Sequence, residues 1–259
     1  MKLETLIVER SGDGIATVTL NRPEKKNAIK GAMWDELMAT FREVGESATD
    51  RVLVLTGAGD AFCAGADLTP SGGDTRHQLD RMHHYGWVGL ALHEIPKPCI
   101  AKVNGVAVGA GLNLALGCDL IVAGESARFA EIFAKRGLSI DLGGSWLLPR
   151  LVGIHKAKEL ALLADMLSAR EAERIGIVNR VVPDAELDKF VGEWAAKLAG
   201  GPPIALQMTK RMIASGLSMS MSEALHWEAM AQSVTSGTQD TQEAMRAFFE
   251  KRAPVFRGR

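Results

Sequence analysis

Residues 105–113 read Gly-Val-Ala-Val-Gly-Ala-Gly-Leu-Asn and lie between apolar runs at 98–104 and 112–117. The first run predicts a buried strand, and the second predicts one or two turns of buried helix. The first backbone N–H groups of a helix have no intrahelical acceptor, and the helix dipole adds positive potential there. Glycine and alanine in such a turn let a ligand approach the backbone. The stretch is typical either of a tight packing turn or of a site for a phosphate or a developing oxyanion.

Two nucleotide-binding motifs do not fit this stretch. A dinucleotide fingerprint needs Gly-x-Gly-x-x-Gly, whereas residues 109–114 lack the third glycine and lie far from the first predicted strand. The sequence also contains no Gly-x-x-x-x-Gly-Lys-[Ser/Thr] motif. An oxyanion site is therefore favoured over a nucleotide-phosphate cradle.

Composition is typical of a soluble globular protein, with 259 residues, 47% hydrophobic residues and 24% charged residues. The length allows one large domain or a domain with a small appendage. A formal charge of −1 gives no electrostatic basis for binding nucleic acid or an anionic membrane. Cys63, Cys99 and Cys118 lack metal-like spacing and predict buried free thiols in a reducing compartment. With no signal peptide or membrane-spanning run, we expect a cytoplasmic protein without a metal.

The N-terminal part alternates predicted strands and helices. Residues 5–10 and 15–20 flank a turn and predict a β-hairpin, and the apolar run at 51–57 is typical of a strand covered on both faces. A helix is expected from about residue 31 to residue 46. Its apolar stripe comprises Met33, Leu37, Phe41 and Val44.

A second stretch of small residues, Phe-Cys-Ala-Gly-Ala-Asp-Leu at 62–68, lies just past the carboxyl end of the strand at 51–57. Open α/β sheets place ligands there, although small residues can also serve only close packing. Residues 69–86 predict a mobile segment followed by a helix that runs to about residue 94. The neighbouring His83 and His84 do not share a helix face, so they predict surface histidines rather than a metal site.

Asp141 stands among apolar residues and glycines, just before a predicted helix that carries Trp146. It can be the N-cap or a first-turn acid of that helix, which is a common structural role. It can equally be a partly desolvated carboxylate with a raised pKa, suited to proton transfer. The residues alone leave both interpretations open.

Further along, strands are predicted at 119–124 and 178–183, and Ser-Ala-Arg-Glu at 168–171 predicts a capping box. Consecutive helices are then expected, with several methionines at apolar positions that indicate core or subunit interface. The composition changes from α/β to all-α near residue 195. The expected helices are 184–199, 203–215, 218–236 and 239–251.

Several motifs together resemble the crotonase superfamily, also called the enoyl-CoA hydratase/isomerase family. They are the central turn, Asn-Arg-Pro…Asn-Ala at 21–28, the stretch at 62–68, Gly-Gly…Leu-Pro-Arg-Leu-Val-Gly at 143–153 and Phe-Phe-Glu-Lys-Arg at 248–252. The resemblance covers essentially the whole chain. It implies an α/β fold in which residues 1–195 form a spiral of ββα units with the CoA-ester site. Residues 196–259 would form a C-terminal helical trimerisation region, and the chain would assemble as a homotrimer or a dimer of trimers.

The resemblance also implies a shared chemistry, in which two backbone N–H groups polarise the carbonyl of an acyl-CoA thioester. By position these groups match Ala66 and Ala110. One fixed donor of this kind contributes roughly 2.7–4 kcal/mol in a well-studied enzyme. No cofactor is expected, because coenzyme A is part of the substrate.

Other residues match positions that contact the coenzyme A. The adenine would lie against the backbone near Ala28 and Ala64, with Asp67 and Leu68 nearby. Phe248 and Lys251 match tail positions that reach a coenzyme A, often from a neighbouring subunit.

The chain departs from the hydratases of the family at both of their glutamates. Asn113 stands at the first position, and both ways of counting to the second position end at Phe133. Glu131 is two residues away and would substitute only if the local alignment shifted. Hydration usually needs two carboxylates, one to activate water and one to deliver a proton.

Asp141 instead matches the catalytic aspartate of several non-hydratase branches, which include dienoyl-CoA and enoyl-CoA isomerases and haloaromatic acyl-CoA dehalogenases. One carboxylate facing an enolate suffices to move a proton between the α and γ carbons. The resemblance therefore favours an isomerase-like reaction, with Phe133 and Trp146 either lining an apolar acyl pocket or serving as plain core. The alternatives are 2-enoyl-CoA hydration by Asp141 or Glu131 with an Asn113-held water, and a non-catalytic acyl-CoA-binding subunit.

Overall fold

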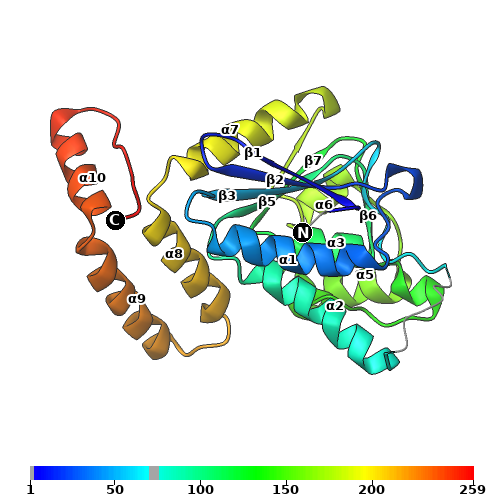
Figure 1. Cartoon of the computed structure of the whole chain (residues 1–259). Helices are drawn as coiled ribbons and strands as arrows, with labels where there is room; N and C mark the ends of the chain where they lie inside the picture. The colour runs from blue at the N-terminus through cyan, green and yellow to red at the C-terminus, as the bar shows by residue number, and fades with distance from the viewer. Residues whose placement is uncertain (1–2, 70–75) are drawn as a thin grey trace.

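The computed structural model describes residues 3–69 and 76–259. Within these ranges, two β-sheets and the helices around them form a body, and three C-terminal helices extend away from it (Figure 1). The predicted mobile segment falls partly on residues 70–75, which lie outside the described residues. The helix expected after it is present as α2 (Gln78–His93).

The larger sheet of the described chain contains six strands in the order β1-β2-β3-β5-β7-β10. β1 and β2 form the predicted antiparallel hairpin, and the other neighbouring pairs are parallel. The strands predicted at 51–57, 119–124 and 178–183 are confirmed as β3, β7 and β10. The bounds are β1 Leu6–Arg10, β2 Ile15–Leu20, β3 Val52–Gly57, β5 Cys99–Val103, β7 Leu120–Gly124 and β10 Arg180–Val182.

A smaller sheet, in the order β4-β6-β8-β9, was not recognised in the sequence. Its strands are two or three residues long, which is too short to give an alternating pattern. The strand predicted at 98–104 does not lead directly into the glycine-rich turn. β5 ends at Val103, and β6 is a separate strand of the other sheet that leads to Gly109. The bounds are β4 Ala61–Cys63, β6 Val106–Val108, β8 Arg128–Ala130 and β9 Leu167–Ser168.

Successive units of the chain each place one strand in each sheet before a helical segment. The units are β3-β4-α2, β5-β6-α3 (Ala110–Gly117) and β7-β8 followed by the 3-10 helix η2 (Ile132–Arg136). Because each unit repeats the same path, β3, β5 and β7 run parallel in one sheet, and β4, β6 and β8 run parallel in the other. This is the expected spiral of ββα units.

Helices cover both faces of the larger sheet, which explains the nearly continuous apolar run of β3. Leu53 and Leu55 point to the main core beneath α1, whereas Val52 and Val54 point to a second core against α7. The predicted stripe of α1 is fully buried, and the three cysteines are buried free thiols as predicted. The remaining bounds are η1 Pro23–Lys25, α1 Ala32–Glu46, α4 Gly144–Val152, α5 Ile154–Leu163, α6 Ala169–Arg174, η3 Asp184–Glu186 and α7 Leu187–Ala199. The capping box at Ser168 and Glu171 is confirmed.

Three C-terminal helices, α8 (Pro203–Gly216), α9 (Met221–Ser236) and α10 (Gln239–Glu250), confirm the helices expected there. With the following tail they form the C-terminal arm, residues 203–259, whose α9 and α10 stand apart from the sheets at the left of Figure 1. α7 still packs on the larger sheet through Ala195 and Ala199. Much of the apolar surface of the arm is exposed, including Ile213, Leu217, Trp227, Met230, Phe248 and Phe249. A surface of this extent is typical of an interaction face.

Lys210 of α8 connects the arm to the body. Its Nζ lies 2.8 Å from Asp119 Oδ2 and donates a hydrogen bond to Lys97 O at 3.0 Å. The same Asp119 oxygen accepts the Cys99 N–H at 2.7 Å, so the ion pair lies at the start of β5. Only 12% of the Lys210 side chain is exposed, against 28% of the Asp119 side chain. Removing one partner of such a pair leaves a poorly solvated charge.

We expect Lys210→Met to lower the free energy of unfolding by about 2 kcal/mol, somewhat less than the cost of breaking a fully buried pair. Urea unfolding followed by circular dichroism measures the loss. Lys102→Met is the matched control, because the Asp188 partner of Lys102 is 85% exposed, and its loss is expected to stay below about 1 kcal/mol. Equal losses in the two variants would contradict the anchoring role of Lys210.

Candidate active site

Several of the candidate site residues follow three neighbouring parallel strands of the smaller sheet. β4 leads to Gly65 and Ala66, β6 leads to Ala110, and β8 leads to Glu131. The carboxyl ends of adjacent parallel strands lie at one edge of a sheet, where ligands bind in α/β folds. The stretch at 62–68 was expected directly after the strand of the larger sheet. β4 intervenes, and the site is instead organised by the smaller sheet.

The backbone N–H groups of Ala66 and Ala110 are both available. Ile29 forms a parallel bridge to Ala66, in which the Ile29 N–H donates to Gly65 O at 2.8 Å and the Asp67 N–H donates to Ile29 O at 2.9 Å. This pairing leaves the Ala66 N–H directed away from Ile29. Ala110 is the first residue of α3, so its N–H has no intrahelical acceptor. Among the described residues, neither N–H has a hydrogen-bond acceptor.

The two segments that carry these N–H groups are packed backbone against backbone. A Cβ on Gly65 would lie 2.9 Å from Val108 O and 3.7 Å from Ala110 N, and a Cβ on Gly111 would overlap Cys63 O. Gly65 also has φ +90°, a conformation that disfavours other residues. Glycine is therefore required at both positions to bring Ala66 and Ala110 to one place.

Asp141 lies beside the first turn of α3. Its backbone oxygen accepts Asn113 Nδ2 at 3.0 Å and the Gly144 N–H at 2.9 Å. The N-cap of α4 is Gly143, with no side-chain cap, so the Asp141 carboxyl does not cap this helix. Burial raises the pKa of the carboxyl to about 6. Asp141 is thus partly buried and does not cap the helix, which leaves its role in proton transfer as a prediction.

Asn113 and Phe133 are both buried; they stand where the resemblance leads us to expect the two hydratase glutamates. The ring of Phe133 packs against the turn, within 3.6 Å of the place that a Cβ on Gly109 would take. Glu131 nevertheless lies near Asn113 and Asp141 without any shift of the chain. Burial and then the charge of Asp141 raise the pKa of Glu131 to about 8. The amide of Asn113, which lies near the carboxyl but makes no hydrogen bond to it, opposes the shift. The sequence signal for this residue was one acid inside the apolar run 129–133.

The four residues expected near the adenine lie together. Arg22 Nη1 donates to Ala28 O at 2.5 Å, and its Nη2 lies 3.1 Å from Asp67 Oδ2. Hydrogen bonds from Thr69, and then from Arg22, lower the pKa of Asp67 to about 2. The Ala64 N–H donates to the backbone of the same segment, at Lys26 O. Leu68 is 60% exposed beside them.

The sequence interpretation gave Arg22 no role, although it stands in one of the quoted motifs. Its side chain joins the segment at 26–29 to the segment at 64–67, which are far apart along the chain. A single arginine before a proline carries no local signal for such a contact.

Trp146 lies on a different side of the segment that contains Asp141. Its ring faces the guanidinium of Arg150 at 3.7 Å and meets His93 of α2 edge-on at 5.3 Å. It lines a cavity of about 990 Å³ between α2, α4 and α8, together with Leu142 and Lys210. Phe133 is not among the residues that line this cavity.

Phe248 and Lys251 are carried by α10 and its C-terminal end. Phe248 is 76% exposed, and Lys251 adopts a left-handed conformation at the helix C-cap. Figure 1 places α10 at the far end of the arm, away from α3. Within one chain, these two residues are therefore not brought to Ala66 and Ala110.

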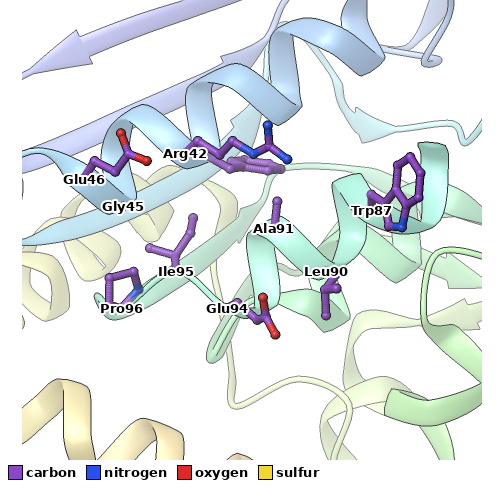
Figure 2. A pocket seen from close by; sticks show the side chains of 10 residues that line it. Arg42, Gly45, Glu46, Trp87, Leu90, Ala91, Glu94, Ile95 and Pro96 are labelled. Carbon is purple, nitrogen blue, oxygen red and sulfur yellow. The ribbon is translucent and has the colours of Figure 1, made fainter. Parts of the chain in front are cut away.

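A second cavity, of about 350 Å³, lies between α1 and α2 and contains none of the predicted site residues. Figure 2 shows Arg42 and Glu46 on one side of it and Leu90 and Glu94 on the other.

Within the described ranges, no group of three potential metal-ligating side chains occurs. His84, one of the two neighbouring histidines, lies with its Nε2 2.9 Å from Asp35 Oδ1. Every helix in these ranges is too short or too polar to cross a bilayer.

Comparison with known proteins identifies the family. The family model described as enoyl-CoA hydratase/isomerase matches residues 10–259. The chain belongs to this family. A Rhodobacter capsulatus relative named "probable enoyl-CoA hydratase" is 40% identical over the full length of both chains. The 1,2-epoxyphenylacetyl-CoA isomerase of Escherichia coli is 39% identical, with 95% of this chain and 96% of the relative covered.

Solved structures confirm the crotonase fold. The enoyl-CoA hydratase of Bacillus anthracis superimposes with a TM-score of 0.94 at 34% identity, and the match covers 99% of this chain and 100% of that one. The protein is thus an enzyme of the enoyl-CoA hydratase/isomerase family. The names of its relatives include both reactions, so they do not decide between hydration and isomerisation.

Gly65→Ala tests whether the spacing of Ala66 and Ala110 matters for activity in this family member. The added Cβ would meet Val108 O, so we expect the Ala66 N–H to move and turnover of an enoyl-CoA to fall about 100-fold, as when one oxyanion donor is lost. Steady-state kinetics with enoyl-CoA esters measure the effect.

Gly153→Ala is the control, because Gly153 has φ +77° and no atom within 4 Å of an added Cβ. Both glycines have a positive φ that disfavours alanine, so the control carries backbone strain without the contact at Val108 O. Similar turnover in the two variants would count against the proposed use of Ala66.

Proposed function

We propose that the protein isomerises an enoyl-CoA thioester, with Ala66 and Ala110 polarising the carbonyl and Asp141 carrying the proton. The observation that carries the proposal is the Asp141 carboxyl. It is partly buried, has a pKa raised to about 6 and is free of any helix-capping role. A base with this pKa is ionised near neutral pH and still holds a proton long enough to return it.

The proposed reaction balances without a cofactor or redox partner. Ionised Asp141 removes a proton from the α carbon of a 3-enoyl ester, and the electron pair shifts into the conjugated enolate. The two N–H groups then stabilise the negative charge on the thioester oxygen. Asp141 returns the same proton at the γ carbon, which moves the double bond into conjugation and restores the carboxylate.

Asn113 and Phe133 support the isomerase over the usual hydratase arrangement. Neither can exchange a proton with water or substrate in the manner of a carboxylate. Asn113 instead donates to the backbone of Asp141, which holds the segment that carries the base. The similarity to a relative named as an isomerase agrees with this choice.

Hydration of a 2-enoyl-CoA is the second candidate, and Glu131 is the observation that favours it. A second carboxyl near Asp141 would supply the acid–base pair that hydration needs. In that reaction Asp141 would activate a water held by Asn113, and Glu131 would deliver the proton. The similarity to a relative named as a hydratase agrees with it.

For the rest of the substrate, we infer that coenzyme A binds along Ala28, Ala64, Asp67 and Leu68. Phe133 would line the apolar acyl pocket beside the turn at Gly109. Trp146 would line a separate part of it, the cavity between α2, α4 and α8. The arm would assemble the cytoplasmic protein into trimers or dimers of trimers. In such an assembly Phe248 and Lys251 would reach the coenzyme A of a neighbouring copy, because they lie far from the site of their own chain.

Asp141→Asn is expected to lower turnover at least 1,000-fold, a loss of roughly 4 kcal/mol of transition-state stabilisation, and to leave CoA-ester binding within about threefold of wild type. Products from a 2-enoyl and a 3-enoyl ester are resolved by chromatography and mass, and binding is followed by ligand-dependent thermal stability. Asp165→Asn is the control, because Asp165 is an exposed partner of Lys135. A product heavier by one water would select hydration, and full activity of Asp141→Asn would remove the aspartate from either mechanism.

The pH dependence of kcat/KM follows from the same group. A base must be ionised, so activity requires the form of Asp141 that predominates above its pKa of about 6. We expect kcat/KM to be level above this pH and to fall about tenfold per pH unit below it. A profile measured in buffers of constant ionic strength tests this expectation. A rate that stays level down to pH 4.5 would be incompatible with Asp141 as the base.

A further inference from the structure

Glu131 is a buried carboxyl that the isomerisation mechanism does not use. It follows β8 directly, and its neighbour Ala130 accepts the Gly109 N–H at 2.9 Å. This contact places residue 131 next to the N-terminus of α3. The residue is only 1% exposed.

The groups around Glu131 leave several oxygens without donors. Both Glu131 carboxyl oxygens, Asn113 Oδ1 and Asp141 Oδ1 are buried and have no hydrogen-bond partner among the described residues. The charged group near Glu131 is the Asp141 carboxylate, which repels a negative charge on Glu131. The polar group near Glu131 is the side-chain amide of Asn113 in α3. Within the described chain, no cation forms an ion pair with Glu131 or Asp141.

Two ionised carboxylates in this setting would repel each other and lack compensation for lost hydration. A single proton on one of the two carboxyls removes the repulsion and supplies a hydrogen-bond donor. If Glu131 carries it, the acid becomes a donor, and Asp141 Oδ1 or Asn113 Oδ1 can accept. Because Glu131 is more deeply buried than Asp141, Glu131 is the group that keeps the proton. Its own oxygens are shielded, so it acts through Asp141 and not on the acyl chain.

We propose that Glu131 is a positioning residue: a neutral carboxylic acid behind Asp141 that donates a hydrogen bond within the Asn113–Asp141 cluster and keeps Asp141 ionised. The proposal rests on the proposed function only for the role of Asp141 as the base. The protonation of Glu131 in the resting protein does not depend on any reaction.

Infrared difference spectroscopy of the whole protein tests the protonation directly. At pH 7 we expect a band of a protonated carboxylic acid in the wild-type protein that is absent from Glu131→Gln and retained in Asp141→Asn. A wild-type spectrum without this band would overturn the proposal. The measurement needs no substrate, so its outcome stands even if the protein turns over neither enoyl-CoA ester.

Two variants of similar size then test the role of the hydrogen bond. Glu131→Gln keeps a donor but cannot ionise. We expect its kcat/KM to stay within about threefold of wild type and to fall at the same low pH as in the wild type (the acid limb of the profile). Glu131→Met removes the donor. Since a hydrogen bond to the charged form lowers a pKa, its loss should move the acid limb of kcat/KM up by about one pH unit. Thermal unfolding of each variant confirms that the fold is intact.

The possible results separate the models. An unchanged acid limb in folded Glu131→Met would overturn the proposal. A Glu131→Gln variant as inactive as Asp141→Asn would also overturn it, because Glu131 would then transfer a proton itself, as the hydration candidate requires. An inactive wild type with the infrared band present would reject the proposed function and leave the protonated Glu131 in place.

Discussion

The site depends on a close backbone approach between the end of β4 and the N-terminus of α3. Gly111 lies against the Cys63 carbonyl, and Gly65 lies against the carbonyl of Val108. A side chain at either glycine would push apart the two segments that carry Ala66 and Ala110. Because the donors are backbone groups, their positions are set by the sheet and helix and not by rotamers. Such preorganised donors need little rearrangement when negative charge develops nearby.

The two acids and Asn113 are positioned by the same architecture but come from different parts of the spiral. Asn113 belongs to the helix that follows β6, Glu131 follows β8, and Asp141 precedes α4. Their meeting point is buried, and burial disfavours the charged form of each carboxyl. Unequal burial separates the pKa values, to about 6 for Asp141 and about 8 for Glu131. Two carboxyls with separated pKa values are typical of acid–base sites.

Most of the larger sheet and the helices could be predicted from the sequence, because long periodic segments such as α1 and the apolar run of β3 signal their faces. The smaller sheet could not, since its strands are too short to show a period. This omission matters for the site, because β4, β6 and β8 are the elements that bring its parts together. The N–H groups of Ala66 and Ala110 were located through the family resemblance. The proximity of Glu131 and the bridging role of Arg22 required the folded structure, because both are contacts between distant segments.

The arm carries much of the exposed apolar surface of the described chain. Its helices α8 to α10 bury few side chains, while Ile213, Trp227 and Phe249 are exposed. Lys210 anchors the base of the arm to Asp119 beside the sheet, so the arm has a defined starting point. An apolar surface held out in this way is stabilised when it is covered. If a second copy covers it, the residues at the far end of α10 come to lie beside a body other than their own. Assembly and coenzyme A binding would then be linked, because each would stabilise the same arrangement of arm and site.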